Sequence, residues 1–153
     1  MARLEDIPEP TRTAVRDIPC PSFDTAPFVS GPKLAERRVA IVSSAALIHR
    51  GDKPFAFGSG EYRAVPSSWP NADILMSHVS INYDRAGFQR DINVAYPIDR
   101  LRDLAADGTI ASVAETHYTV MGSTDPAAME ASADRIAAAL HADRVNAVVL
   151  APV

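Results

Sequence analysis

The residues of this chain best suited to acid–base chemistry are its four histidines, because imidazole gains or loses a proton near neutral pH. His49, His78 and His117 each follow a predicted strand or lie in the loop beyond one, whereas His141 ends a predicted helix, where a positive charge is favourable. A loop histidine can act as a general acid or base, contact a substrate, or anchor its loop through hydrogen bonds. We therefore take His78 and His117 as candidate proton donors, with loop anchoring as the alternative for each.

Two further polar residues, Asp91 and Asn93, lie just before a helix predicted over residues 97–108. Short polar side chains in such a place bond to backbone amides and order the loop that enters the helix. The same groups could instead bind a ligand. The residue types leave both interpretations open.

Nucleophilic and metal-binding patterns are weak in this sequence. Cys20, the one cysteine, lies between two prolines without an electropositive neighbour, which favours an incidental thiol over a nucleophile. Ser43 and Ser44 follow a predicted strand, but they are not part of a Gly-x-Ser-x-Gly elbow. Residues 58–60 (Gly-Ser-Gly) lack the strand and helix of a dinucleotide-binding fingerprint. A single cysteine excludes a multi-thiolate site, and the histidines and carboxylates have no diagnostic ligand spacing, so we expect no metal.

Length and charge limit the possible classes of function. The 153 residues are enough for one domain with a real core. The net charge of −4 lacks the basic excess that binding to nucleic acid requires. No apolar stretch reaches the roughly 18 residues of a membrane span, and the N-terminus lacks the hydrophobic region of a secretory signal. We therefore expect a soluble, cytoplasmic protein that binds neither nucleic acid nor membrane.

The prolines divide the chain into an arm and a domain. Six of the 12 prolines lie between Pro8 and Pro32, and proline lacks the N–H that a helix interior or a central strand needs. Residues 1–36 are therefore predicted to form a proline-rich N-terminal arm. Apolar side chains in this arm indicate that it lies across a surface of its own domain or of a partner subunit. Residues 37–153 form the predicted domain.

Within the domain, buried strands alternate with amphipathic helices. Uninterrupted apolar runs suit strands that are buried on both faces of a sheet, and proline at a helix start or glycine at its end marks the helices. The predicted strands are 39–46, 73–79, a short strand or turn at 110–113, 115–122 and 146–153; the predicted helices are 97–108 and 125–141; residues 52–71 form a long ordered loop. This order predicts an α/β fold of three layers, in which helices flank a largely parallel sheet.

The last predicted strand ends at Val153, which is also the last residue of the sequence. In open α/β sheets the ligand crevice lies beyond the carboxyl ends of the strands. The sequence therefore stops where such a fold would place its reactive group. An ordinary edge strand with nothing after it is the alternative.

A pattern within residues 77–122 resembles a known family. It consists of Ser77-His78, Tyr83-Asp84, the block Arg-Asp-Ile-Asn-Val-Ala-Tyr-Pro-Ile-Asp-Arg-Leu-Arg-Asp-Leu at 90–104, and His-Tyr-Thr-Val-Met-Gly at 117–122. Together with residues 39–45, 50–52 and 147–153, this pattern resembles the glycine/sarcosine/betaine reductase selenoprotein B family, which includes the selenocysteine subunit of D-proline reductase. The resemblance covers residues 37–153, and its most specific part is Asp-Ile-Asn-Val with the following Pro-Ile-Asp-Arg-Leu.

The resemblance implies a redox pair directly after the last strand, namely selenocysteine or cysteine, two further residues and then a cysteine. It also implies reductive cleavage of a carbon–nitrogen bond in a small amine or amino-acid-like substrate, with a partner subunit and a thiol reductant. Selenocysteine is encoded by UGA, which is ordinarily a stop codon. We therefore expect that the chain is truncated at such a codon after Val153, that the full-length form carries selenocysteine, and that this 153-residue form is inactive or feebly active.

In this family reading, five residues would line or order the pocket beside the redox pair: His78, Asp91, Asn93, His117 and Tyr118. His117 or His78 would give the proton that is needed when the carbon–nitrogen bond breaks. The alternative reading is a non-catalytic module that binds a small molecule or assists assembly on the same fold, since fold does not determine function. We also expect a homo-oligomer, because an incomplete sheet would expose apolar surface and the arm could reach a neighbouring subunit.

Overall fold

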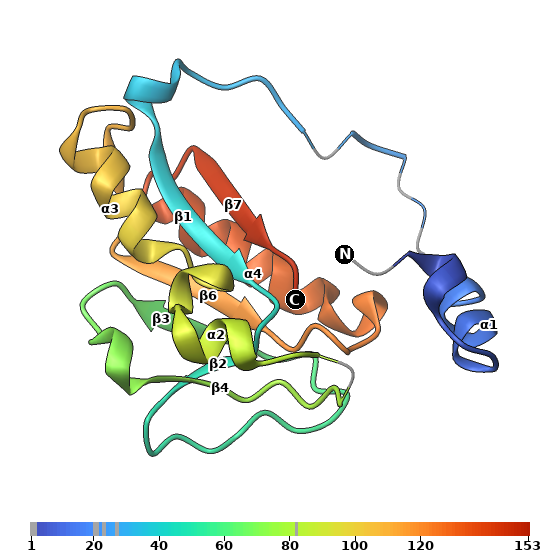
Figure 1. Cartoon of the computed structure of the whole chain (residues 1–153). Helices are drawn as coiled ribbons and strands as arrows, with labels where there is room; N and C mark the ends of the chain where they lie inside the picture. Colours follow the sequence, from blue (N-terminus) through green and yellow to red (C-terminus); the bar gives the residue numbers. More distant parts are fainter. Residues whose placement is uncertain (1–2, 20–21, 23, 27, 82) are drawn as a thin grey trace.

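Strand β1 (Arg38–Ser43) is the centre of the main sheet in the computed structural model, which describes residues 3–19, 22, 24–26, 28–81 and 83–153. Three strands pair with β1 in parallel: β5 (Ser112–Val113), β6 (Thr116–Val120) and β7 (Ala147–Ala151). Because β7 runs along one edge of β1 over residues 39–43, β5 and β6 share the opposite edge. The carboxyl ends of β1, β6 and β7 therefore meet at one side of the sheet (Figure 1).

The sheet is mixed rather than purely parallel. Strand β3 (Tyr62–Pro66) pairs antiparallel with β6. Across the sheet the order is therefore β3, then β6 and β5 one after the other along the same edge of β1, then β1, and β7 on its other edge. Strands β2 (Leu47–His49) and β4 (Ile74–Met76) form a separate antiparallel pair. The predicted strand at 73–79 is thus confirmed in its first half as β4, but its place in the main sheet is wrong.

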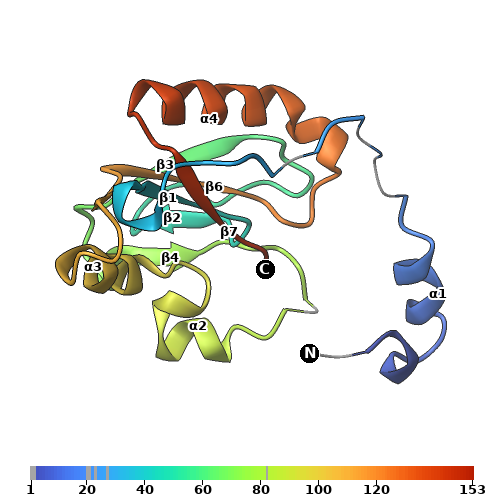
Figure 2. The same ribbon diagram turned by 90° about the horizontal axis from the view of Figure 1, so that it is seen from above.

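Helices cover both faces of the main sheet. Helix α4 (Glu130–Ala142) lies on one face, whereas α3 (Ile98–Ala106), the short α2 (Ala86–Arg90) and the β2–β4 pair lie on the other (Figure 2). Short 3₁₀ turns connect these elements at Asn71–Asp73, Ile92–Val94 and Pro126–Met129. The predicted α/β character with flanking helices is confirmed.

The helix ends follow the predicted chemistry. The Asp125 carboxylate accepts the backbone N–H of Ala127 at 3.0 Å and caps the 3₁₀ turn that leads into α4. Gly108, the second residue after α3, has φ of +78°, the left-handed conformation in which glycine ends a helix. Both predicted helices are therefore confirmed, although the first turn of the 125–141 segment is 3₁₀.

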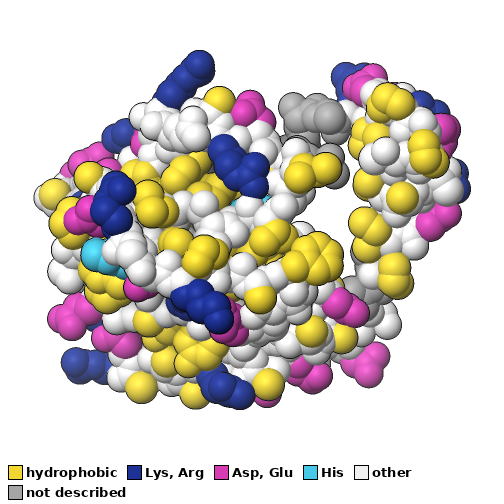
Figure 3. Space-filling view, turned by 90° about the horizontal axis from the view of Figure 1, so that it is seen from below, with side chains coloured by type: hydrophobic (Ala, Val, Ile, Leu, Met, Phe, Trp, Pro, Cys, Tyr) yellow, Lys and Arg dark blue, Asp and Glu magenta, His cyan; other side chains and the backbone are white. Residues whose placement is uncertain are grey.

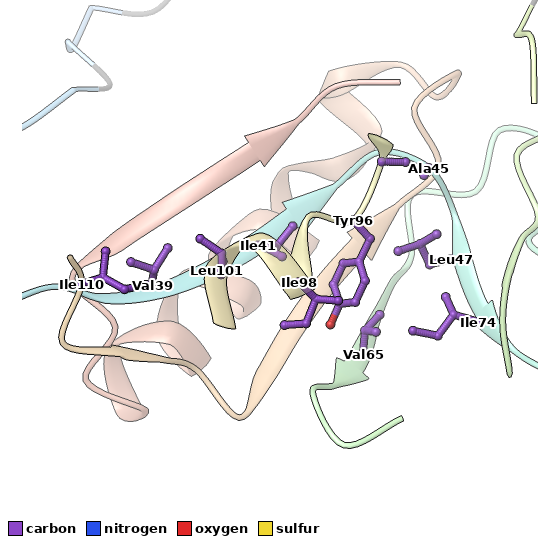
Figure 4. Packing of buried hydrophobic residues seen from close by; sticks show 11 residues of the cluster. Val39, Ile41, Ala45, Leu47, Val65, Ile74, Tyr96, Ile98, Leu101 and Ile110 are labelled. Carbon is purple, nitrogen blue, oxygen red and sulfur yellow. The ribbon is translucent and has the colours of Figure 1, made fainter. Parts of the chain in front are cut away.

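The core lies on both sides of β1. On one side Val39 and Ile41 pack with Ile98, Leu101 and the buried ring of Tyr96, which lies in the loop before α3 (Figure 4). On the other side Ala40 packs with residues of α4. The apolar run of β1 is explained by this double burial, as predicted from its lack of alternation.

Strand β7 differs from its prediction as a strand buried on both faces. Its alternate residues Val148 and Leu150 are 41% and 67% exposed, whereas Val149 packs against the core on the α3 side. Among the described residues β7 pairs with β1 alone, so it is an edge strand and α4 covers its outer face incompletely. A uniformly apolar run therefore does not by itself place a strand inside a sheet.

Two other segments also differ from the sequence expectations. The predicted loop 52–71 contains β3, because its residues pair with β6 over five positions. The predicted arm contains the 3₁₀ turns Leu4–Asp6 and Leu34–Glu36 and the helix α1 (Thr11–Arg16).

The N-terminal segment stands apart from the body across an open gap (Figure 3). Phe28 and Val29 are 89% and 86% exposed, so the expected packing of these side chains across a surface of the same chain is not confirmed. Cys20, the predicted incidental thiol, lies outside the described residues. Within the described part of the chain, no helix has the length and apolar character needed to span a membrane.

Candidate functional site

The carboxyl edge of the main sheet is held together by Ser44, the residue that follows β1. Its backbone N–H donates to the carbonyl of Ala151 at 3.1 Å, which extends the β1–β7 ladder by one step. Its hydroxyl oxygen accepts the backbone N–H of Val153 at 2.8 Å, and the same hydroxyl lies 3.4 Å from the Val153 carbonyl oxygen. The backbone that leaves β7 is therefore attached to the end of β1.

Gly122 closes this arrangement from the end of β6. Its N–H donates to the Ser44 carbonyl at 2.9 Å. A Cβ atom at position 122 would lie 2.9 Å from both the carbonyl oxygen and Oγ of Ser44, which is closer than real Cβ contacts. Glycine is required here for close approach of two backbones. Ser44 thus joins the ends of β1, β6 and β7 at one point.

Buried hydroxyl groups fix the turn that follows Ser44. The Ser43 hydroxyl donates to the carbonyl of Ala95 at 2.8 Å and accepts the N–H of Ala45 at 3.2 Å. Thr119 of β6 accepts the N–H of Leu47 through Oγ1 at 3.0 Å. Ser43 and Thr119 are fully buried, so each satisfies backbone groups that would otherwise be costly to bury. The turn is consequently a rigid support for the carboxyl edge.

His117 lies inside the molecule, on β6. Its Nδ1 accepts the backbone N–H of Ile41 at 3.0 Å, between the positions where β1 pairs with β5 and with β6. The neutral ring must therefore carry its proton on Nε2. This Nε2 and the hydroxyl of Tyr96, whose ring meets the imidazole edge-on at 5.4 Å between centroids, have no hydrogen-bond partner among the described residues.

Burial controls the protonation of these two side chains. It lowers the pKa of His117 to about 4, with the positive charge of Arg102 as the next cause. Burial also raises the pKa of Tyr96. His117 is therefore neutral at neutral pH. Its hydrogen bond to Ile41 fits the alternative role given above, a histidine that anchors the backbone, better than the role of a proton donor.

Tyr118 faces the opposite side of the sheet from His117, because successive residues of a strand point to opposite faces. Its ring packs with Ile136 and Leu140 of α4 and lies 5.9 Å from the ring of Tyr62. Burial raises the pKa of the Tyr118 hydroxyl. The structure therefore does not bring His117 and Tyr118 into one pocket.

Asp91 and Asn93 order the entry to α3. The Asp91 carboxylate accepts the backbone and side-chain N–H groups of Asn93 at 2.9 and 2.8 Å. The Asn93 carbonyl oxygen accepts the backbone N–H of Asp99 in the first turn of α3 at 3.0 Å, and its amide donates to the Asp99 carboxylate at 3.1 Å. Bonds from Asn93 are the main cause that lowers the pKa of both carboxyl groups. The loop-ordering interpretation accounts for these contacts.

We expect Asn93→Ala to lower the free energy of unfolding by about 1–2 kcal/mol, because it removes the cap of the first turn of α3. Asn71→Ala is the matched control, since Asn71 donates to the same Asp99 carboxylate through one hydrogen bond of 2.8 Å. Urea unfolding followed by the fluorescence of Trp69 measures both changes. Equal losses in the two variants would contradict the capping role of Asn93.

His78 lies in the loop after β4. Its Nδ1 accepts the N–H of Ser80 at 3.2 Å, while Arg85 donates to the carbonyl groups of His78 and Ser80. The residue is 6% exposed, and its Nε2 has no partner among the described residues. Burial, followed by the Arg85 charge, lowers the pKa of His78. The ring therefore holds a proton on Nε2 as an unused hydrogen-bond donor.

The loop that carries His78 lies at the same end of the sheet as the end of β7. Figures 1 and 2 both place residues 77–81 and 83–85 on the side of the body where the chain leaves β7. Of the five residues expected to line or order a pocket, His78 lies near this edge, because its neighbour Ser77 donates its N–H to the carbonyl of Ala46, two residues beyond Ser44, at 2.9 Å. Asp91 and Asn93 lie at the entry to α3, and His117 and Tyr118 lie in the core on opposite faces of the sheet.

A groove of about 670 Å³ lies between α4 and the outer face of β7. Its lining is almost entirely apolar: Val42, Val120, Pro126, Ala127, Met129, Glu130, Ala133, Ile136, Ala137, Leu140, Val148 and Leu150. Neither Ser44 nor Gly122 lines this groove, and Ala133 and Ala137 of α4 are exposed in it. In the described part of the chain, no cluster of three or more His, Cys, Asp or Glu residues could hold a metal ion.

The chain is similar to a known protein family and to two reductase subunits. Residues 16–153 match the family described as glycine/sarcosine/betaine reductase selenoprotein B. D-proline reductase subunit gamma of Acetoanaerobium sticklandii is 31% identical over 121 residues, which cover 77% of this chain and 49% of that protein. Glycine reductase complex component B subunit gamma of Carboxydothermus hydrogenoformans is 27% identical over 141 residues, which cover 88% of this chain and 32% of that protein. The chain thus spans about half and about a third of the lengths of these relatives. No solved structure is significantly similar to it.

Proposed function

The chain belongs to the glycine/sarcosine/betaine reductase selenoprotein B family, and we propose that it is the scaffold of a reductase subunit that cleaves a carbon–nitrogen bond in a small amine or amino-acid-like substrate. The observation that carries the proposal is the position of the backbone that leaves β7. It is hydrogen-bonded to Ser44 at the carboxyl edge of three parallel strands, where α/β folds bind their ligands.

We propose that a selenocysteine and cysteine pair belongs directly after Val153. Such a pair supplies two electrons: a selenolate or thiolate displaces the amine, the second thiolate frees the reduced carbon by forming a selenenyl sulfide or disulfide, and a thiol reductant restores the pair. The amine and the carbon each take up one proton. The part of this chain in that chemistry is to hold the pair at the sheet edge and to contact the substrate.

His78 is the residue that we propose for substrate contact. Its Nε2 is buried and unpartnered among the described residues, and its loop lies at the edge where β7 ends. A neutral imidazole there donates a hydrogen bond to an acceptor atom of the substrate. We assign no proton transfer to His117, because its ring lies in the core between Ile41 and Tyr96 and not in the loop at the sheet edge.

We also propose that the protein works with partner subunits and forms a homo-oligomer. The relatives are named as subunits, and one of them belongs to a glycine reductase complex. The exposed Val148 and Leu150 beside the apolar groove support association, because large exposed apolar patches are uncommon on proteins that act alone.

We expect the codon after Val153 to be UGA, followed by an open frame that encodes cysteine three codons further on. The native product should then be longer than 153 residues and contain selenium, which intact mass measurement and elemental analysis detect. This product should reduce an amine substrate with a thiol reductant, and the 153-residue chain should not. A native product that ends at Val153 and lacks reductase activity would contradict the proposal and favour a non-catalytic binding or assembly module.

A further inference from the structure

The segment that leaves β7 has an unusual backbone attachment. In a parallel ladder the next bond from β7 would run from the Val153 N–H to the Ser44 carbonyl, but that carbonyl accepts the Gly122 N–H instead. The ladder ends at the bond between the Ser44 N–H and the Ala151 carbonyl. Beyond that point the Ser44 side chain takes over, because its hydroxyl accepts the Val153 N–H at 2.8 Å.

The backbone around Ser44 is fixed by its neighbours, which limits where the Ser44 hydroxyl can lie. Gly122 donates its N–H to the Ser44 carbonyl at 2.9 Å, and the absence of a side chain at position 122 lets the two backbones come together. On the other side, the buried Ser43 hydroxyl bonds to Ala45 and Ala95 and fixes the turn. Ser44 is half-buried, so it has a small range of positions from which to bond to Val153.

We propose that Ser44, supported by Gly122, is a positioning residue: it sets the direction of the backbone that leaves β7 and so the position of the nucleophile-bearing segment. This inference rests on the proposed function for its catalytic consequence, but the attachment itself is a property of the present chain. It adds to the reductase proposal a residue that neither contacts substrate nor carries the reacting atoms.

The attachment is tested on the 153-residue chain by amide hydrogen exchange measured by NMR. We expect Ser44→Ala to accelerate exchange of the Val153 amide about fivefold or more, while the amide of Val149 in β7 and the Tm stay unchanged. Ser44→Thr, which keeps an oxygen at the same position, should restore slow exchange. Ser123→Ala, at an exposed serine beside Gly122, is the control. Unchanged exchange of Val153, or equal acceleration throughout β7, would overturn the attachment.

The catalytic consequence is tested on the native, selenium-containing product with its partner subunits and thiol reductant. Ser44→Ala should lower kcat at least tenfold with KM unchanged, and Ser44→Thr should recover most of the lost rate. An active wild type with an equally active Ser44→Ala variant would overturn the positioning role. An inactive wild type would instead contradict the proposed function, and the exchange result would still decide the attachment.

Discussion

Gly60→Ala is expected to lower the free energy of unfolding by about 3 kcal/mol or more, because a Cβ atom there collides with backbone that cannot move freely. The new atom would lie 2.1 Å from the carbonyl oxygen of Ala128 in the 3₁₀ turn before α4. The collision would separate the loop between β2 and β3 from the start of this helix. Urea unfolding at pH 7 measures the loss.

Two hydroxyl groups donate hydrogen bonds to the same loop and hold it against the start of α4. Ser132 of α4 donates to the Gly60 carbonyl at 2.6 Å, and Thr124 donates to the Ser59 carbonyl at 2.9 Å. The side chains of Ser132 and Thr124 are both buried. Separation of loop and helix therefore breaks two part-buried hydrogen bonds in addition to the steric cost.

Gly87→Ala is the matched control for Gly60→Ala. A Cβ atom at Gly87 would meet Val94 at an ordinary 3.7 Å, and alanine is favoured over glycine within a helix such as α2. We expect this variant to be as stable as the wild type or slightly more stable. If Gly60→Ala does not fold, Ser132→Ala tests the same contact with an expected loss of about 1 kcal/mol. Wild-type stability of both Gly60→Ala and Ser132→Ala would contradict the contact.

A strand was predictable from the sequence where its local pattern of apolar residues matches its burial in the fold. β1 is apolar from Val39 to Val42 because both of its faces are covered, and the sequence shows this directly. β7 has the same kind of pattern, yet it is an edge strand, since pairing partners depend on residues far away in the chain. β3 was missed within the 52–71 loop because its burial comes from pairing with β6, 50 or more positions later.

In the candidate site, too, contacts between neighbouring residues were predictable and contacts between distant residues were not. Loop ordering by Asp91 and Asn93 is local, so residue types were enough to predict it as an alternative. The role of Ser44 was missed because its partner Val153 is 109 positions away. The separation of His117 and Tyr118 had a usable signal: neighbouring residues in a predicted strand at 115–122 must face opposite sides of a sheet.

His117 gives the protein a specific dependence of stability on pH. Its pKa is lowered from 6.5 to about 4 in the folded chain, first by burial and then by the Arg102 charge. Between these two values the unfolded chain binds the proton and the folded chain does not. Stability therefore rises with pH: this contribution is complete above pH 6.5 and is lost as the pH falls towards 4. Lowered carboxyl pKa values, such as that of Asp99, act in a more acidic range.

We expect the wild type to lose about 3 kcal/mol of unfolding free energy between pH 7 and pH 4 through His117, since each pKa unit corresponds to about 1.4 kcal/mol. His117→Gln has no proton to bind in this range, so the His117 part of the pH dependence should vanish and leave the part from His78, whose pKa burial also lowers. The variant starts with a lower free energy of unfolding at pH 7 because the contacts with Ile41 and Tyr96 are altered. Urea unfolding at half-unit pH steps measures the two slopes, and His141→Gln, at an exposed position of α4, is the control. Parallel slopes for wild type and His117→Gln would show that the buried imidazole does not control acid stability, and that another group must take up the proton.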